Sequence, residues 1–238
     1  MMEKYIETKR LILRPLRKEV NKDMKYRIMK ESDIENVISL YNEEKLYTYI
    51  ETYAKQNQLH QTITALPYAR QMHKGQYRKG KEKIPYICHP LLVARHALAL
   101  GLDNDNLISA ALLHDVCEDC GISVQDLPVN EETKHIVALL TKEDSPKAKT
   151  EEGKEAYYSA IAQDVFAVMI KLLDRCNNVS GMASGFEKEK MIQYIKETEK
   201  WFYPLIEHAK REYPIYTNQI FLIEYQILSV IESIKYQL

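Results

Sequence analysis

The sequence contains little glycine: seven residues in 238, the first of them Gly75. Glycine supplies the positive dihedral angles and the close backbone approach that phosphate-cradling loops need. No G-x-G-x-x-G pattern occurs. Residues 75–81 have the spacing of G-x-x-x-x-G-K, but the next residue is Glu82, where a G-x-x-x-x-G-K-[S/T] loop requires Ser or Thr. The sequence therefore argues against a kinase-like or dinucleotide-binding loop.

Long apolar runs and an excess of charge are lacking as well. No stretch approaches the roughly 20 apolar residues that span a bilayer, and the start, MMEKYIETKR, lacks the apolar core of a secretory signal. With 33 basic and 34 acidic side chains the net charge is -1, so no global field draws the chain to DNA, RNA or an anionic membrane. We therefore expect a cytoplasmic protein, and in that reducing compartment we expect its four cysteines to be thiols.

The pattern of residues predicts a mainly α protein with a small N-terminal α/β appendage. Residues 1–55 contain a β-like run from Arg10 to Arg14 and then a helix start near Ser32. From about residue 56 apolar residues recur at helical spacing. We expect a helical domain over 56–211, with a turn at Gly181, and a C-terminal packing helix over 212–238.

The strongest chemical signal is HDVCED, residues 114–119, at the end of an expected helix over 106–119. Helical spacing pairs His114 with Glu118 and Asp115 with Asp119. Because burying a carboxylate is costly unless it is paired or bound to a metal, these groups need either water or a divalent cation. The alternative is a solvated acidic helix end with a capping histidine.

Two residues outside that cluster can complete a metal site. His89 stands before Pro90 in the first turn of an expected helix, and Asp174 stands near the end of another over 165–178. Imidazole nitrogen and carboxylate oxygen are both accepted by a borderline divalent metal. We therefore expect His89, Asp174 and the 114–119 cluster to share one ion.

A basic strip precedes His89 in the sequence. Its members are Arg70, His73, Lys74, Arg78, Lys79, Lys81 and Lys83. Such a strip can supply counter-charge to a polyphosphate, and Arg78 can stack on a base or fork to a phosphate. The alternative is a solvated basic loop, because exposed lysines are common.

Five segments together resemble the HD superfamily, in particular the hydrolase domain of RelA/SpoT homologues and the stand-alone small alarmone hydrolases. They are YARQMHKGQYRK (68–79), PYICHPLLVA (85–94), AALLHDVCED (110–119), LLTKED (139–144) and KLLDRCNNV (171–179). The resemblance implies an HD-domain helical bundle that hydrolyses the guanosine tetraphosphate-type alarmone ppGpp.

The resemblance also implies roles for single residues. The metal ligands would be His89, His114, Asp115 and Asp174, with Mn²⁺ as the usual ion. Glu118 and Asp119 would position and activate the attacking water. Arg78, Lys79 and Asn178 would contact the nucleotide. Where the family usually has a histidine before its final asparagine this chain has Asn177, and Ser180-Gly181 also departs from the family pattern; we expect both changes to affect base recognition more than metal binding.

A second, shorter resemblance concerns the N-terminal segment. ETKRLILRPL (7–16) and YRIMKESDIENVISLYNEE (26–44) resemble the opening strand and helix of GNAT acetyltransferases. That superfamily binds acetyl-CoA on a glycine-containing loop, and no glycine precedes Gly75. We therefore interpret residues 1–55 as a packing appendage and not as an acetyltransferase.

Three functions follow as hypotheses. The first is a pyrophosphohydrolase that removes the 3′-diphosphate of ppGpp or pppGpp, with a guanine nucleotide as its small-molecule partner. The second is an HD nucleotide phosphatase that acts on another nucleotide and releases orthophosphate. The third is a catalytically silent module that senses a nucleotide. A homo-oligomer is compatible with each of them.

Overall fold

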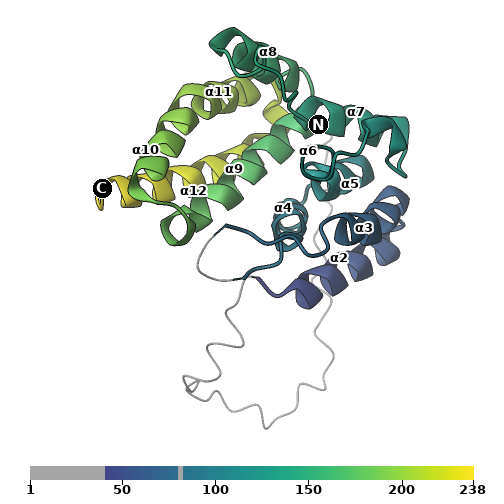
Figure 1. Cartoon of the computed structure of the whole chain (residues 1–238). Coiled ribbons are helices and arrows are strands. Elements are labelled where there is room, and N and C mark those ends of the chain that lie inside the picture. Colours follow the sequence, from purple (N-terminus) through teal and green to yellow (C-terminus); the bar gives the residue numbers. More distant parts are fainter. Residues whose placement is uncertain (1–40, 80–82) are drawn as a thin grey trace, which may run out of the picture. The chain divides into compact units, whose positions relative to one another are not determined.

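The computed structural model describes residues 41–79 and 83–238, and every element below belongs to that part of the chain (Figure 1). The α-helices are α2 (Glu43–Asn57), α3 (His60–Met72), α4 (Cys88–Ala99), α5 (Asp105–Leu113), α6 (Val116–Cys120), α7 (Glu131–Leu140), α8 (Glu151–Ile161), α9 (Val165–Gly185), α10 (Lys188–Glu197), α11 (Tyr203–Glu212) and α12 (Thr217–Lys235). Two short 3₁₀ segments, η1 (Val124–Asp126) and η3 (Pro214–Tyr216), and a π-helical segment, η2 (Thr198–Phe202), join some of them. The predicted mainly α fold is confirmed, whereas the β-like run of the appendage lies outside the described residues.

Helices α5 and α9 form the centre of the bundle. Helix α5 packs against α3, α4, α7 and α9, and α9 packs in addition against α7, α8, α11 and α12. The sequence of α5, DNLISAALL, is apolar on nearly every face, and all residues from Leu107 to Leu113 are buried. Full burial of one leucine or isoleucine side chain contributes about 1.5–3 kcal/mol. The apolar residues that surround HDVCED therefore anchor it to the core.

The central helices differ from their expected bounds. The helix expected over 106–119 is interrupted, because His114 and Asp115 form a turn between α5 and α6. The helix expected over 165–178 continues to Gly185, so the turn predicted at Gly181 was wrong and Asp174 lies in the middle of α9. Glycine is tolerated inside a helix at a modest cost, and neighbouring packing maintains α9 here.

Residues 73–79 and 83–87, the described residues between α3 and α4, are joined by backbone hydrogen bonds, and Lys79 lies close to α9. The backbone N–H of Arg78 donates to the carbonyl of Ile84 at 2.9 Å, and that of Tyr86 donates to Gln76 at 2.9 Å. A Cβ atom on Gly185 would lie 3.0 Å from the carbonyl oxygen of Lys79, so glycine permits this close approach. Next to Lys79, the side chain of Arg78 contacts Asn177 and Asn178 of α9.

Helix α2 crosses the domain boundary expected at residue 55 and packs against α3 and α4. The greater part of the expected appendage, residues 1–40, lies outside the described residues. At the other end, α12 packs along α9 (Figure 1).

No single helix among residues 41–79 and 83–238 is long and apolar enough to cross a membrane. The pair Glu151–Ile161 and Val165–Ala183 meets the length and composition test only when its helices are joined, and it is bent by 119° at the break.

Candidate metal centre

The side chains of His89, His114, Asp115 and Asp174 meet in the interior. His89 comes from the first turn of α4, His114 and Asp115 from the turn between α5 and α6, and Asp174 from the middle of α9. The two imidazole side chains are each only 3% exposed, and the carboxylates of Asp115 and Asp174 are 21% and 13% exposed. The structure thus brings together all four of the expected ligands.

The distances between the donor atoms suit a small cation. Nε2 of His89 lies 3.4 Å from Asp115 Oδ2 and 3.2 Å from Asp174 Oδ1, while Nε2 of His114 lies 3.1 Å and 4.0 Å from the same two oxygens. Ligands about 2.0–2.2 Å from one ion in tetrahedral or octahedral geometry are roughly 2.8–3.6 Å apart. Three of the four distances fall in that range. His89, His114 and Asp115 form a compact group of potential metal ligands whose atoms lie within 4.8 Å of one another, and Asp174 adjoins that group through its contact with His89.

The hydrogen bonding of His114 leaves a lone pair that a cation would satisfy. Its Nδ1 lies 2.8 Å from the carbonyl oxygen of Ala111, which can only accept, so the network assigns the hydrogen to Nδ1. Among the described residues, Nε2 is buried without a hydrogen-bond partner, although Asp115 Oδ2 lies close to it. An imidazole lone pair that faces carboxylate oxygens is stabilised by a metal ion, and the residues present therefore fit one.

The two carboxylates also have partners other than the imidazoles. The Tyr86 hydroxyl donates to Asp115 Oδ2 at 2.7 Å. Asp174 Oδ2 accepts from the buried ammonium of Lys171 at 3.3 Å, and Asp174 Oδ1 accepts from Asn178 Nδ2 at 2.5 Å. Such outer contacts fix the orientation of ligands and tune the affinity for a metal.

Without an ion, protons on the imidazoles compensate the carboxylates. Burial lowers the pKa of His89, but hydrogen bonds with Asp115 and Asp174 outweigh burial and raise the pKa to about 9. For the Asp115 carboxyl, burial alone would raise the pKa, but the adjacent His114 and His89 hold it well below its usual range. For Asp174, burial is outweighed by the Lys171 ammonium and by His89, which lower its pKa. A metal that binds here must therefore displace protons.

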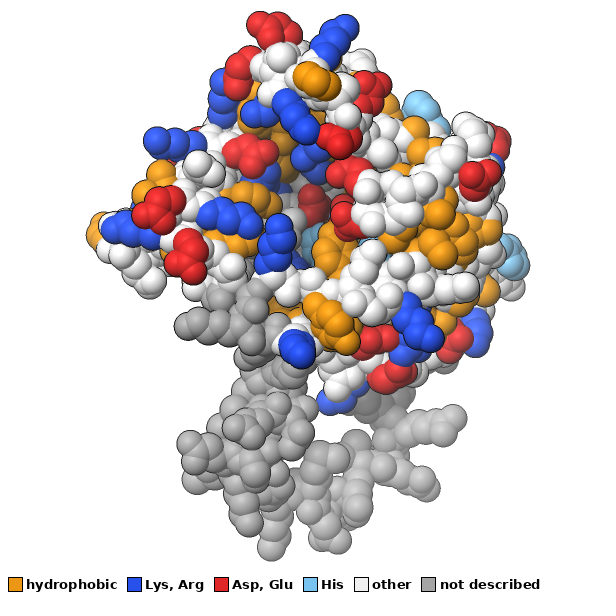
Figure 2. Space-filling view, viewed as in Figure 1, with side chains coloured by type: hydrophobic (Ala, Val, Ile, Leu, Met, Phe, Trp, Pro, Cys, Tyr) orange, Lys and Arg blue, Asp and Glu red, His pale blue; other side chains and the backbone are white. Residues whose placement is uncertain are grey.

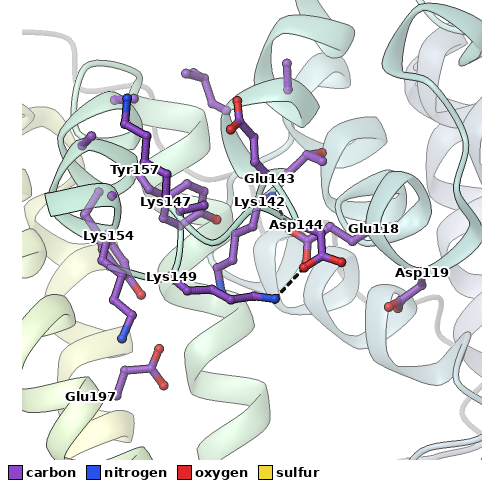
Figure 3. A pocket seen from close by; sticks show the side chains of 18 residues that line it. Glu118, Asp119, Lys142, Glu143, Asp144, Lys147, Lys149, Lys154, Tyr157 and Glu197 are labelled. Carbon is purple, nitrogen blue, oxygen red and sulfur yellow. Dashed lines mark hydrogen bonds and ion pairs between the residues drawn. The ribbon is translucent and has the colours of Figure 1, made fainter. Parts of the chain in front are cut away.

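Glu118 and Asp119 project from α6 into an adjoining pocket and do not take part in the compact ligand group (Figure 3). The pocket has a volume of about 740 Å³ and is also lined by residues of α8 and the loop before it. On the side of the molecule in view, Figure 2 shows a hollow with charged side chains of both signs around it. Glu118 Oε1 accepts from the backbone N–H of Lys142.

Close packing and ion pairing shape the loop beside the pocket. A Cβ atom on Gly153 would clash with the carbonyl of Lys147, so glycine lets this loop lie against the start of α8. Lys149 is paired with Asp144 at 2.6 Å (Figure 3).

The expected nucleotide contacts have a more complex arrangement. Arg78 donates through Nη1 to Asn177 Oδ1 at 2.8 Å and through Nη2 to Asn178 Oδ1 at 3.0 Å. Lys79 is exposed. The basic strip is not continuous, because Arg70 is paired with Glu43 and Glu44 and His73 is buried. Lys81 lies outside the described residues.

Three contacts of the metal centre were not found from the sequence. Lys171 and Tyr86 lie in the quoted family segments. Lys171 stands three residues before Asp174 on the same helix, a local spacing that could have indicated the pair, whereas Tyr86 is 29 residues from its partner Asp115. Asn177, which we expect to affect base recognition, has Oδ1 2.6 Å from Nδ1 of His89. Its contact with a ligand makes it part of the metal centre.

Comparison with known proteins agrees with the geometry. A family model described as "HD domain" matches residues 65–212. The chain is 34% identical over 187 residues to the bifunctional (p)ppGpp synthase/hydrolase SpoT of Escherichia coli K12, a match that covers 73% of this chain and 26% of that protein. It is 34% identical over 166 residues to a guanosine-3′,5′-bis(diphosphate) 3′-pyrophosphohydrolase of Aquifex aeolicus, covering 68% of this chain and 23% of that protein. The chain thus spans about a quarter of the length of these curated relatives.

A solved structure shares the fold. It is described as "A metazoan ortholog of SpoT hydrolyzes ppGpp and plays a role in starvation responses", and its TM-score to this chain is 0.58 at 22% sequence identity. The match covers 73% of this chain and 95% of that one.

Proposed function

Because this chain belongs to the HD domain family, we propose that it is a metal-dependent pyrophosphohydrolase that removes the 3′-diphosphate of ppGpp or pppGpp and releases pyrophosphate. The observation that supports this most directly is the convergence of His89, His114, Asp115 and Asp174 near a pocket whose lining includes Glu118 and Asp119. The names of the relatives from Escherichia coli and Aquifex aeolicus support the same substrate class.

The proposed ion is one Mn²⁺ held by the two imidazoles and two carboxylates. When bound, a divalent ion polarises a phosphoryl oxygen and lowers the pKa of water. Glu118 and Asp119 are exposed carboxylates at the edge of the pocket, so they can hold the attacking water and accept its proton. Departure of the 3′-diphosphate as pyrophosphate then needs no covalent intermediate with the protein.

The pocket also offers counter-charge for phosphate groups. Lys142, Lys147 and Lys154 line it together with Tyr157 (Figure 3). The ammonium of Lys171 and then burial lower the pKa of Lys142. A bound phosphate would relieve that repulsion between the two lysines. The same pocket is also lined by the carboxylates of Glu118, Asp119, Glu143, Asp144 and Glu197.

Arg78, Lys79 and Asn178 stay the predicted contacts to the nucleotide. Arg78 and Asn178 lie next to the metal centre, and Lys79 precedes the undescribed residues 80–82. We also propose a cytoplasmic enzyme that acts on a small molecule rather than on DNA, RNA or a membrane. The division into an appendage over 1–55, an HD domain over 56–211 and a packing helix over 212–238 likewise stays a prediction.

A nucleotide panel with separate readouts for orthophosphate and pyrophosphate tests the proposal. Purified protein with Mn²⁺ is expected to convert ppGpp to GDP and pyrophosphate, and the Asp174→Ala variant is expected to leave ppGpp intact. If ppGpp stays intact while another nucleotide releases orthophosphate, the protein is a general HD phosphatase. If nucleotides bind without turnover, it is a sensing module and the proposal fails.

A further inference from the structure

Asn177 connects Arg78 to a ligand of the proposed metal centre. It lies on α9 three residues beyond Asp174. Its Oδ1 lies 2.8 Å from Nη1 of Arg78 and 2.6 Å from Nδ1 of His89. One amide oxygen thus connects Arg78, in the segment before α4, to His89 in the first turn of α4.

These contacts determine which nitrogen of His89 faces the ion. A guanidinium can only donate, so the Asn177 atom that faces Arg78 is the carbonyl oxygen. The same oxygen can only accept from His89, which assigns the hydrogen of His89 to Nδ1. The lone pair of the neutral ring is then on Nε2, 3.2 Å from Asp174 and 3.4 Å from Asp115.

A competing assignment is weaker. Nη1 of Arg78 also lies 3.4 Å from Nδ1 of His89, and Nδ1 could accept that hydrogen if it carried none of its own. Two lone pairs would then face each other across the 2.6 Å between Nδ1 and Asn177 Oδ1. The shorter contact, between Nδ1 and Asn177 Oδ1, therefore places the hydrogen on Nδ1, because two acceptors with no hydrogen between them repel each other at that distance.

A second chain of hydrogen bonds runs from Arg78 through Asn178 to the proposed ligand Asp174. Its Nη2 donates to Asn178 Oδ1 at 3.0 Å, and Asn178 Nδ2 donates to Asp174 Oδ1 at 2.5 Å. One guanidinium therefore orients two adjacent amides, and each amide contacts a different ligand. The planar fork of arginine suits such paired contacts, whereas a lysine would supply a single point charge.

We propose that Asn177 is a positioning residue that sets the ring nitrogen His89 presents to the metal, and that Arg78 acts on the metal centre through Asn177 and Asn178. The inference rests on the proposed metal site but not on the nucleotide. It assigns to Asn177 a role in metal binding instead of the expected role in base recognition.

Binding of Co²⁺ alone to the full chain tests this inference. Asn177→Leu keeps the approximate size of the side chain but removes the acceptor, whereas Asn177→Asp keeps an acceptor oxygen. Loss of an outer partner of a ligating histidine lowers metal affinity by about 10–100-fold. We expect that loss for Asn177→Leu, measured by chelator competition, and a much smaller loss for Asn177→Asp.

Proton NMR of the Co²⁺-loaded protein reads the hydrogen on Nδ1 directly. The wild type should show two paramagnetically shifted, exchangeable imidazole N–H signals, one from His89 and one from His114. Asn177→Leu should lose one of them to exchange with water, and Asn177→Asp should keep both. The matched control is Asn178→Leu on the same helix, which removes the contact to Asp174 and should keep both signals.

A double-mutant cycle tests the part played by Arg78. Arg78→Gln should weaken Co²⁺ binding in the wild-type background and weaken it much less in the Asn177→Leu background, because the two residues act in one chain of contacts. Additive losses would show that Arg78 does not act through Asn177. Thermal unfolding in the presence of a chelator shows whether each variant is folded.

The outcomes separate this inference from the proposed function. If Asn177→Leu retains both N–H signals, the positioning role is refuted, whatever happens to affinity. If the wild type binds no Co²⁺, the proposed metal centre fails and this inference fails with it. If Co²⁺ binding behaves as expected while ppGpp is not hydrolysed, only the proposed substrate is wrong.

Discussion

Replacing Glu118 should separate metal binding from turnover. Glu118 is exposed at the edge of the pocket, and its Oε1 accepts from the backbone N–H of Lys142. Glu118→Gln keeps an acceptor oxygen for that contact but cannot accept a proton from water. Glu118→Ala removes both functions. Neither substitution alters a proposed metal ligand, so both variants should retain the ion.

The expected magnitudes follow from these contacts. A positioned general base contributes roughly 10²–10⁴-fold to rate. We expect losses in that range for both variants, equivalent to about 2.7–5.4 kcal/mol of transition-state stabilisation. Glu118→Ala should in addition lose about 0.5–1.5 kcal/mol of folding stability with its hydrogen bond, whereas Glu118→Gln should lose little.

The assay combines metal content after gel filtration, thermal unfolding and release of pyrophosphate from ppGpp. Glu143→Gln, a change at another carboxylate that lines the same pocket, is the matched control and should retain near wild-type turnover. A fully active Glu118→Ala enzyme would refute the mechanism. A Glu118→Gln variant that loses its metal would show that the carboxylate belongs to the metal site.

Three further predictions concern the ligands and their partners. His114→Ala and Asp174→Ala should each abolish metal retention, measured as metal content after gel filtration, and retention by either variant would remove that residue from the site. The pKa of His89 is raised to about 9 in the metal-free protein, so the contribution of its protonated ring to folding stability is present below about pH 6.5 and is lost as the pH rises through 9. Metal affinity should rise over the same pH interval, because fewer protons must be displaced from the imidazole. Calorimetric titrations that find a pH-independent affinity would contradict this prediction. Lys171→Met should destabilise the metal-free protein by about 3–5 kcal/mol in urea unfolding, because it removes the ammonium that pairs with the buried Asp174 carboxylate. The same change at the exposed Lys149 should cost at most about 1 kcal/mol, and equal losses at the two lysines would show that burial of the pair is unimportant.

Local sequence was sufficient for the helical architecture and indicated the segments that meet at the centre, whereas the choice of His89, His114, Asp115 and Asp174 as the four ligands came from the family resemblance. His114 and Asp115 directly follow a fully apolar segment, so burial of that segment brings them into the interior. His89 precedes a proline that fits a first helical turn, and it lies in the first turn of α4. These features depend on residues adjacent in sequence, where patterns are informative.

Other features depend on contacts between distant residues. The turn at His114 and Asp115 has no glycine or proline to mark it. The contacts of Asn177 with Arg78 and His89 join residues 99 and 88 positions apart, and spacing within one helix cannot predict them. Gly181 resembles a turn signal but lies within α9, because tertiary packing overrides a modest local cost.

The turn between α5 and α6 has an evolutionary consequence. His114 and Asp115 are anchored by the buried helix before them, whereas Glu118 and Asp119 belong to a separate five-residue helix at the rim of the pocket. Changes confined to that short helix can abolish or redirect the chemistry while the ion-binding residues remain in position. A receptor that retains its ion but has lost turnover is therefore only a few substitutions away from an enzyme of this architecture.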